Sequence, residues 1–385
     1  AEASHAGAFG FSSSRTISHK SKMGDFTPTL RANELELTAI AKGLADAGHG
    51  FIEMVSDWDE PSPEEEFNMF RRVVEASGRP MVFTCNQRHD GRGTFWKDLM
   101  TYAREARDDG HILRPVVAPR PIGVMLGLNG SQNPFSGTPT YRSIEHLPLD
   151  QRVEAMSQPD IRAKILSEDP VKQSTFPLIH RILFTQMFRL GSPANYTPSP
   201  EESISAMAQN LGVTPQEMAY DILLENQGRG FIYAPLVNYA NYTMDACAEM
   251  LDDPYSIMGL GDGGAHVGFI LDAGYPTWLI SYWNQKQKRY SVEETVRRLT
   301  SDTAKAVGLF DRGRIAVGLK ADFNVIDWSS VRAGDPYLIS DLPAGGSRLM
   351  QEVFGYKVTI LSGEVTYCDG VATGATPGKL VRSHA

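Results

Sequence analysis

The stretch IMGLGDGGAHVGF, Ile257–Phe269, places one aspartate and one histidine among five glycines, directly after a short apolar run. Such a run is typical of a buried strand, and the polar residue after it lies at the strand's carboxyl end. In parallel α/β barrels the active site is built at that end. The stretch therefore predicts that Asp262 faces a site at the mouth of a barrel. The alternative is a tight turn that Asp262 caps, because Asp-Gly is common in turns.

Upstream of this stretch, short apolar runs alternate with amphipathic patterns. Ser62 can cap a helix that begins at Pro63, and the glutamates that follow suit its positive end. Repeated units of this kind predict a parallel sheet or a (β/α) barrel. Strands are predicted near residues 8–12, 50–56, 79–87, 112–120 and 256–262, and helices near residues 32–47, 62–77, 95–107, 277–285 and 292–300.

Two regions depart from this alternation. Residues from about 121 to 200 form a long insertion rich in Pro, Ser and Asn, with helical pieces near Ile161–Leu166 and Leu178–Met187. Long irregular segments in compact enzymes often form walls or lids of the active site. From residue 309 onward, apolar and polar residues alternate around glycine turns, as in short antiparallel strands. We therefore predict a barrel over residues 1–308 and a small β-domain over residues 309–385.

Composition excludes several classes of partner. The formal net charge of -9 disfavours nucleic acid, which requires a basic face. No apolar run approaches the roughly 20 residues that cross a bilayer. Three cysteines, Cys85, Cys247 and Cys368, lie far apart and form no disulfide framework. A reducing, cytoplasmic location is therefore expected.

Four stretches occur in the order found in one known family. They are GAFGFSSSR from Gly7, GLGDGGAH from Gly259, RGRIAVGLKADFNVID from Arg312 and SGEVTYCDGVATGATPGKLVR from Ser362. Together they resemble the amidohydrolase superfamily, within it the N-acyl-D-amino-acid deacylase (D-aminoacylase-like) group. The resemblance implies a (β/α)8 barrel of the TIM type beside a small β-sandwich. It also implies hydrolysis of C–N bonds with one or two zinc ions.

The same resemblance indicates that part of the barrel is missing. The first strand of the family carries a His-x-His metal pair, and no such pair occurs in this sequence. Strands one to three of the barrel are expected upstream of Ala1, in the full-length chain or in a companion subunit. A parallel barrel without them has two bare apolar edges, which soluble proteins avoid. We favour a fragment of a longer chain, and association into a homo-oligomer remains open.

Asp262 is the expected catalytic residue and metal ligand. Amide hydrolysis at neutral pH requires a strong nucleophile, and a bound Zn²⁺ brings the pKa of water to about 7 and polarises the carbonyl. A carboxylate beside that water can accept its proton and pass it to the leaving amine. His266, four residues further on, is expected to contact the substrate carbonyl, or alternatively to cap the next helix.

The resemblance places two further metal ligands at the ends of the strands near residues 50–56 and 79–87. Val55 stands at the first of these positions and cannot bind a metal, whereas Cys85 stands at the second and can do so as a thiolate. The alternative for Cys85 is a small buried apolar side chain. A mononuclear site, with Asp262 and the upstream histidines, is therefore also open.

Besides His266, three residues are candidates for binding the substrate. Gln87 replaces the basic residue that the family has after the strand-six ligand, and Arg120 is a nearby cation at a strand end. A guanidinium suits a carboxylate, although a structural role for Arg120 is the alternative. Ser13 follows a strand and can line the pocket.

These residues support three hypotheses for function. The first is a metal-dependent amidohydrolase that cleaves an N-acyl-D-amino acid or a related N-acyl compound by metal-activated water. The second is a cyclic-amide hydrolase of the dihydropyrimidinase or hydantoinase kind, because the cationic clamp is altered. The third is a non-catalytic homologue or partner subunit that has lost its metal site, in line with Val55 and Cys85.

Overall fold

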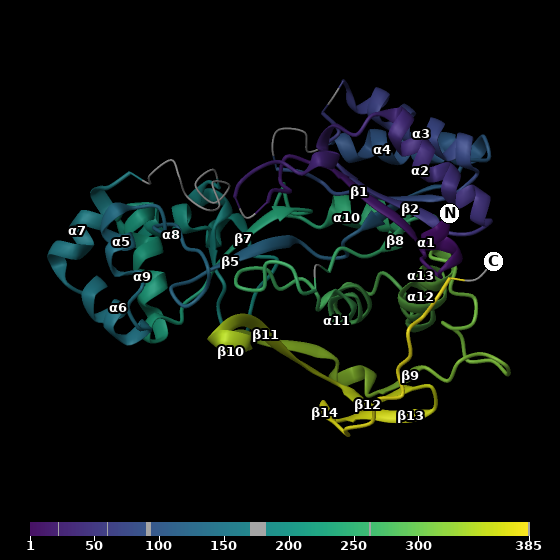
Figure 1. Ribbon diagram of the computed structural model, residues 1–385. Helices are drawn as coiled ribbons and strands as arrows, with labels where there is room; N and C mark the ends of the chain where they lie inside the picture. Colours follow the sequence, from purple (N-terminus) through teal and green to yellow (C-terminus); the bar gives the residue numbers. More distant parts are fainter. Residues whose placement is uncertain (22, 60, 90–93, 170–181, 262, 384–385) are drawn as a thin grey trace.

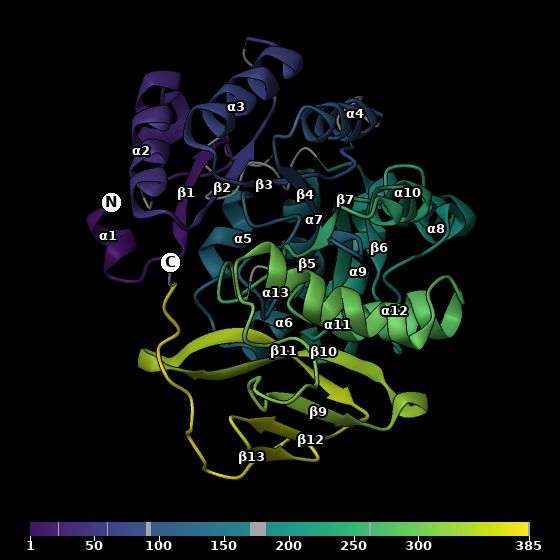
Figure 2. The same cartoon turned by 90° about the vertical axis from the view of Figure 1, so that its right-hand side faces the viewer.

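A five-stranded parallel sheet forms the centre of the structure (Figures 1 and 2), a computed structural model that describes residues 1–21, 23–59, 61–89, 94–169, 182–261 and 263–383. Its strand order is β1-β2-β3-β4-β8, and every neighbouring pair runs parallel. The strands are β1 Gly10–Arg15, β2 Phe51–Ser56, β3 Met81–Thr84, β4 Leu113–Val117 and β8 Ile257–Met258. All five lie within or next to the ranges predicted from the sequence, so the α/β class is confirmed.

Helices cover one face of this sheet. They are α2 Glu34–Ala47, α3 Pro63–Ser77, α4 Phe95–Asp108 and α10 Asp245–Asp252, with the short α1 Glu2–His5 near the first. The predicted cap is confirmed, since the Ser62 side chain accepts a hydrogen bond from the Glu65 backbone N–H at the start of α3. Gly48 and Gly78 end α2 and α3 in the left-handed conformation that glycine adopts without strain.

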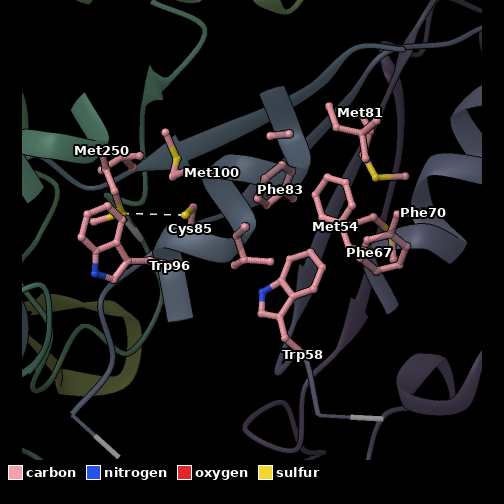
Figure 3. Packing of buried hydrophobic residues seen from close by; sticks show 14 of the residues in the cluster. Met54, Trp58, Phe67, Phe70, Met81, Phe83, Cys85, Trp96, Met100 and Met250 are labelled. Carbon is pink, nitrogen blue, oxygen red and sulfur yellow. Dashed lines mark hydrogen bonds between the residues drawn. The ribbon is translucent and has the colours of Figure 1, made fainter. Parts of the chain in front are cut away.

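Aromatic and sulfur-containing side chains fill the space between the sheet and the helices (Figure 3). The centre of the Trp58 ring lies 5.4 Å from that of Phe70 and 5.5 Å from that of Phe83, and both pairs have edge-to-face geometry. Full burial of one such side chain stabilises the fold by about 1.5–3 kcal/mol. This cluster therefore fixes the strands against α3 and α4.

The segment between β4 and α10 builds a separate lobe. Strands β5 Ile122–Leu126, β7 Ile232–Val237 and β6 Phe188–Arg189 form an antiparallel sheet in the order β5-β7-β6. Helices α5 Pro139–Ile144, α6 Leu149–Met156, α7 Pro159–Ser167, α8 Ile204–Leu211 and α9 Pro215–Gly228 lie beside it (Figure 1). A second hydrophobic cluster runs from Val124 to Phe269, so the lobe includes sequence beyond the predicted insertion. Part of the helix predicted at Leu178–Met187 lies outside the described residues.

After β8 the chain forms the helices α11 Tyr275–Trp278, α12 Val292–Arg297 and α13 Thr303–Ala306, joined by the π-helical segments η5 Leu279–Lys286 and η6 Arg298–Asp302. Two antiparallel sheets follow, as predicted for the end of the chain. One is the hairpin of β10 Arg332–Leu342 and β11 Gly346–Phe354, and the other is β9 Phe323–Ile326, β12 Tyr356–Leu361, β13 Glu364–Cys368 and β14 Val371–Ala372. Leu349 of β11 packs into a cluster with Tyr196 and Tyr233, which joins the hairpin to the lobe.

The parallel sheet is open within the described residues, because β1 and β8 stand at its two edges. The arrangement matches a barrel of which five neighbouring strands are present. The end of the chain returns to the start, where the Ser383 backbone N–H donates to the Gly7 carbonyl. Across the described ranges, every helix is too short or too polar to cross a membrane.

Candidate active site

The face of the parallel sheet opposite the helices is the candidate active-site face, and we call it the open face. One row of paired residues, Ser12, Glu53, Val82 and Arg114, crosses four strands on it. Side chains alternate along a strand, and the neighbours of these residues, such as Met54 and Phe83, belong to the helix-covered cluster. The row therefore lies on the side away from the helices.

Glu53 is a titratable group on the open face that the sequence interpretation missed. Burial raises the pKa of its carboxyl above the ordinary value. Within the described part of the chain the carboxyl forms no hydrogen bond or ion pair. The signal was present in the run FIEMVS, where a lone glutamate interrupts an apolar strand.

Cys85 lies on the other side of the sheet. Its sulfur is fully buried and lies 3.7 Å from Sδ of Met250 on α10, close to Trp96 and Met100 (Figure 3). Burial raises the pKa of the thiol to about 12, which disfavours the thiolate that metal binding requires. Cys85 continues the alternation of Met81 and Phe83, so in this structure it packs as a small apolar side chain.

Two other strand residues follow the same alternation. Ser13 pairs with Met54 and shares its helix-facing side, whereas Ser12 and Ser14 occupy the open face. Val55 pairs with Ser14 and lies on the open face, where it offers no ligand atom. The structure thus brings neither Ser13 nor Cys85 to the open face.

Gln87 is buried in a polar network that the sequence did not reveal. Its backbone N–H donates to Asn238 Oδ1 over 2.8 Å, and its side-chain oxygen accepts from the Ala240 backbone N–H over 3.1 Å. Asn238 also donates from Nδ2 to Asn86 Oδ1 and to the Ala118 carbonyl, each over 3.1 Å. Asn238 is 0% exposed, so this network, which we call the Asn238 clasp, joins the ends of β3, β4 and β7.

Arg120 is also engaged inside the protein. It is 2% exposed, and its Nη2 lies 3.4 Å from Oδ1 of Asp272. The guanidinium carbon Cζ lies 4.2 Å from the centre of the Tyr196 ring. Nη1 donates a hydrogen bond to the Leu271 carbonyl. Arg120 is therefore a structural cation in this structure, which was the alternative in the sequence interpretation.

The loop after β8 connects three parts of the molecule. Asp262 lies outside the described residues. On its C-terminal side, the Phe269 carbonyl accepts from Met125 in β5, the Gly268 carbonyl accepts from Ser131, and the Val267 carbonyl accepts from Leu349 in β11. His266 is exposed, with φ of 48° and its ring 5.3 Å from that of Phe269. The loop thus leaves the sheet at the carboxyl ends of the strands and is held from two sides.

Within the described residues, no group of three or more His, Cys, Asp or Glu side chains is placed to hold a metal ion. Cys85 and Glu53 occupy opposite faces of the sheet, and Asp262 falls outside the described ranges. The described side chains therefore do not fit a zinc ion on their own.

The family model described as the amidohydrolase family matches residues 8–367. The chain belongs to the amidohydrolase family. No curated protein matches its sequence significantly. This amidohydrolase chain is similar to the crystal structure of D-aminoacylase, with 16% identity and a TM-score of 0.53 over 97% of this chain and 62% of that chain.

A second solved structure supports the same fold. It is N-acyl-D-glutamate deacylase from Bordetella bronchiseptica, complexed with zinc and a phosphonate inhibitor, with 15% identity and a TM-score of 0.52 over 99% of this chain and 64% of that chain. A further D-aminoacylase structure is described as having a binuclear metal centre. The amidohydrolase chain thus spans less than two thirds of the length of these proteins, and the likeness shows the barrel fold.

Proposed function

We propose that this chain acts within a metal-dependent amidohydrolase that cleaves the amide bond of an N-acyl-D-amino acid or a related N-acyl compound. The position of residues 259–261 carries the proposal. They leave β8 beside β4, where the carboxyl ends of the parallel strands meet, and they lead directly to Asp262. The family match and the chemistry named for the two structural neighbours support the bond type.

Asp262 is the proposed metal ligand and proton carrier, and zinc is the proposed metal. In line with the family resemblance, we propose that the other ligands come from polypeptide outside this chain, either upstream in the same protein or in a companion subunit. His266 remains the proposed substrate contact on the loop. Arg120 and Gln87 form internal contacts with Asp272 and with the Ala240 backbone N–H.

The test is to measure metal content and hydrolysis of N-acyl-D-amino acids by the protein in its native assembly. We expect bound zinc, and we expect Asp262→Ala to lose both the metal and the activity. Glu154→Gln, a substitution at an exposed position on α6, is the matched control. A folded native assembly that contains no metal and hydrolyses no amide would reject the proposal.

Two observations favour alternative functions. The burial of Cys85 in an apolar cluster favours a non-catalytic homologue, for which the same metal analysis is decisive. The internal roles of Arg120 and Gln87 favour a substrate without a free carboxylate, such as a cyclic amide. Parallel assays with N-acyl-D-amino acids and with cyclic ureides separate the latter from the leading proposal.

A further inference from the structure

Ser14 and His19 form a hydrogen-bonded pair at the carboxyl end of β1, with 2.6 Å between Oγ of Ser14 and Nδ1 of His19. Ser14 lies on the open face, in register with Val55 of β2, and His19 belongs to the loop that follows β1. The carboxyl ends of the strands are where parallel barrels build their active sites. Because β1 and β8 are the two edge strands, this pair lies across the sheet from the loop that leads to Asp262.

The turn that carries His19 is fixed by Asp57, directly after β2. Oδ1 of Asp57 accepts a hydrogen bond from the Thr16 hydroxyl, and Oδ2 accepts one from the Ile17 backbone N–H, each over 2.7 Å. The Thr16 hydroxyl oxygen accepts from the Ser18 backbone N–H over 3.1 Å, and the Thr16 carbonyl accepts from the His19 backbone N–H over 3.4 Å. Asp57 therefore holds the backbone of this turn in place before any substrate binds.

Both side chains of the pair are accessible to a ligand. His19 is exposed, and Ser14 is partly exposed. Within the described residues, the bond to Ser14 is the one side-chain interaction of His19, so the ring nitrogen Nε2 faces solvent. With the ring proton on Nε2, the Ser14 hydroxyl donates to Nδ1. The pair thus joins a nucleophile to a base at the distance that proton transfer requires.

The pair differs from a serine-hydrolase triad in its third member. Among the described residues, no carboxylate forms a hydrogen bond or ion pair with the His19 ring. In a triad that carboxylate stabilises the imidazolium, which gives its proton to the leaving amine. A phenol leaves from an ester far more readily than an amine leaves from an amide, and it needs less assistance. The geometry therefore suits an activated ester rather than an amide.

We propose that Ser14 is the nucleophile and His19 the general base in a metal-independent cleavage of aryl esters. Oγ of Ser14 bonds to the acyl carbon, and its proton passes to Nδ1 of His19. The bond between the acyl carbon and the aryl oxygen breaks, and the proton passes from His19 to that oxygen, so a phenol leaves. Water then gives a proton to His19 and attacks the acyl carbon, which releases the carboxylic acid, and His19 returns the proton to Ser14. This activity goes beyond the proposed amide hydrolysis, because it uses neither Asp262 nor a metal ion.

The test is release of 4-nitrophenol from 4-nitrophenyl acetate by the protein in its native assembly, before and after treatment with a metal chelator. We expect ester cleavage to persist after chelation and in Asp262→Ala. Ser14→Ala and His19→Gln are each expected to lower its kcat/KM at least about tenfold. The matched controls are Ser18→Ala, in the same exposed turn, and His146→Gln, at an exposed position between α5 and α6. Both controls should leave the rate unchanged.

Each outcome of this test separates the two activities. Ester cleavage that disappears on chelation or in Asp262→Ala belongs to the proposed metal site and overturns the role of Ser14. Equal ester cleavage by wild type and folded Ser14→Ala also overturns it, with circular dichroism as the check on folding. Amide hydrolysis is measured on the same samples, so loss of that activity alone rejects the proposed function and leaves the Ser14–His19 pair standing.

A second measurement uses only the wild-type protein. Diisopropyl fluorophosphate reacts with a serine hydroxyl that a base activates, forming an oxygen–phosphorus bond and releasing fluoride with the serine proton. We expect mass spectrometry to place the adduct on Ser14 and not on Ser18, and we expect ester cleavage to fall in proportion to the modified fraction. A protein that is left unmodified at Ser14, or that keeps full ester cleavage after modification, contradicts the proposal.

Discussion

At the residue scale, the three cysteines differ in what surrounds them. Cys85 and Cys247 are buried, and burial raises the pKa of each thiol, whereas Cys368 on β13 is exposed. Only thiolates react quickly with disulfide reagents. We expect Cys368 to react with an aromatic disulfide at pH 8 roughly a thousandfold faster than the other two, which become reactive only in denaturant. Rapid labelling of Cys85 in the folded protein would contradict its burial.

Glu53 gives a residue-scale prediction about pH. Its pKa is raised in the folded state, so the neutral form is favoured there. The contribution of Glu53 to stability is therefore fully present below the unfolded pKa and is lost as pH rises through the folded pKa. We expect Glu53→Gln to be more stable than wild type at neutral pH, and to lose this advantage in acid, as measured by urea unfolding. Exposed Glu154→Gln should show no such gain.

Arg120 allows a direct test of its structural role. Removal of one partner of a buried ion pair is strongly destabilising and costs roughly 3–5 kcal/mol. We expect Arg120→Met to lower the free energy of unfolding by about this amount, because Asp272 is 2% exposed. Arg162→Met, which breaks an exposed pair, should cost about 1 kcal/mol or less. Similar losses in both variants would show that Arg120 is not the structural cation described.

At the element scale, the Asn238 clasp connects strands that belong to different sheets. Asn238 has φ of 64°, a conformation that asparagine tolerates better than most residues. Asn238→Ala removes the partners of the Gln87 N–H and the Ala118 carbonyl, each buried. We expect a loss of about 2–4 kcal/mol in unfolding free energy, with Asn210→Ala at an exposed site on α8 as the control. Equal free energies of unfolding for the two variants would show that the Asn238 clasp does not stabilise the fold.

The elements of the parallel sheet could be predicted because each gives a local signal. The run RPMVFTCNQ contains β3, and Ser62 with Pro63 marks the start of α3. Strand β7 was missed, since its partner β5 lies more than a hundred residues earlier and its apolar run IYAPLV resembles a buried helix segment. Such long-range pairing leaves no local trace in the sequence.

The candidate site was less predictable, because the face that a strand residue occupies depends on alternation along the whole strand. Cys85 ends a series with Met81 and Phe83, and counting in steps of two from Met81 would have placed it under the helices. The Asn238 clasp could not be found this way, since it depends on how the lobe returns to the sheet.

At the scale of the whole molecule, the open parallel sheet should show in hydrogen exchange. Amides of β2 and β3 are paired on both sides, whereas β1 and β8 stand at the edges. We expect edge amides to exchange at least about tenfold faster than those of β3 in the isolated chain. If the proposed upstream polypeptide completes the barrel, its addition should slow exchange at both edges together. Uniform protection of all five strands in the isolated chain would contradict an open sheet.

The hydrogen bonds that hold Val267, Gly268 and Phe269 have a consequence for how this protein can change. The loop takes its shape from β5, Ser131 and β11, which are far from it along the chain. Substitutions in those neighbours can therefore shift His266 by fractions of an ångström while the loop sequence GDGGAH is unchanged. Natural or laboratory selection for a new reaction can thus adjust these three supports before it alters the reacting groups themselves.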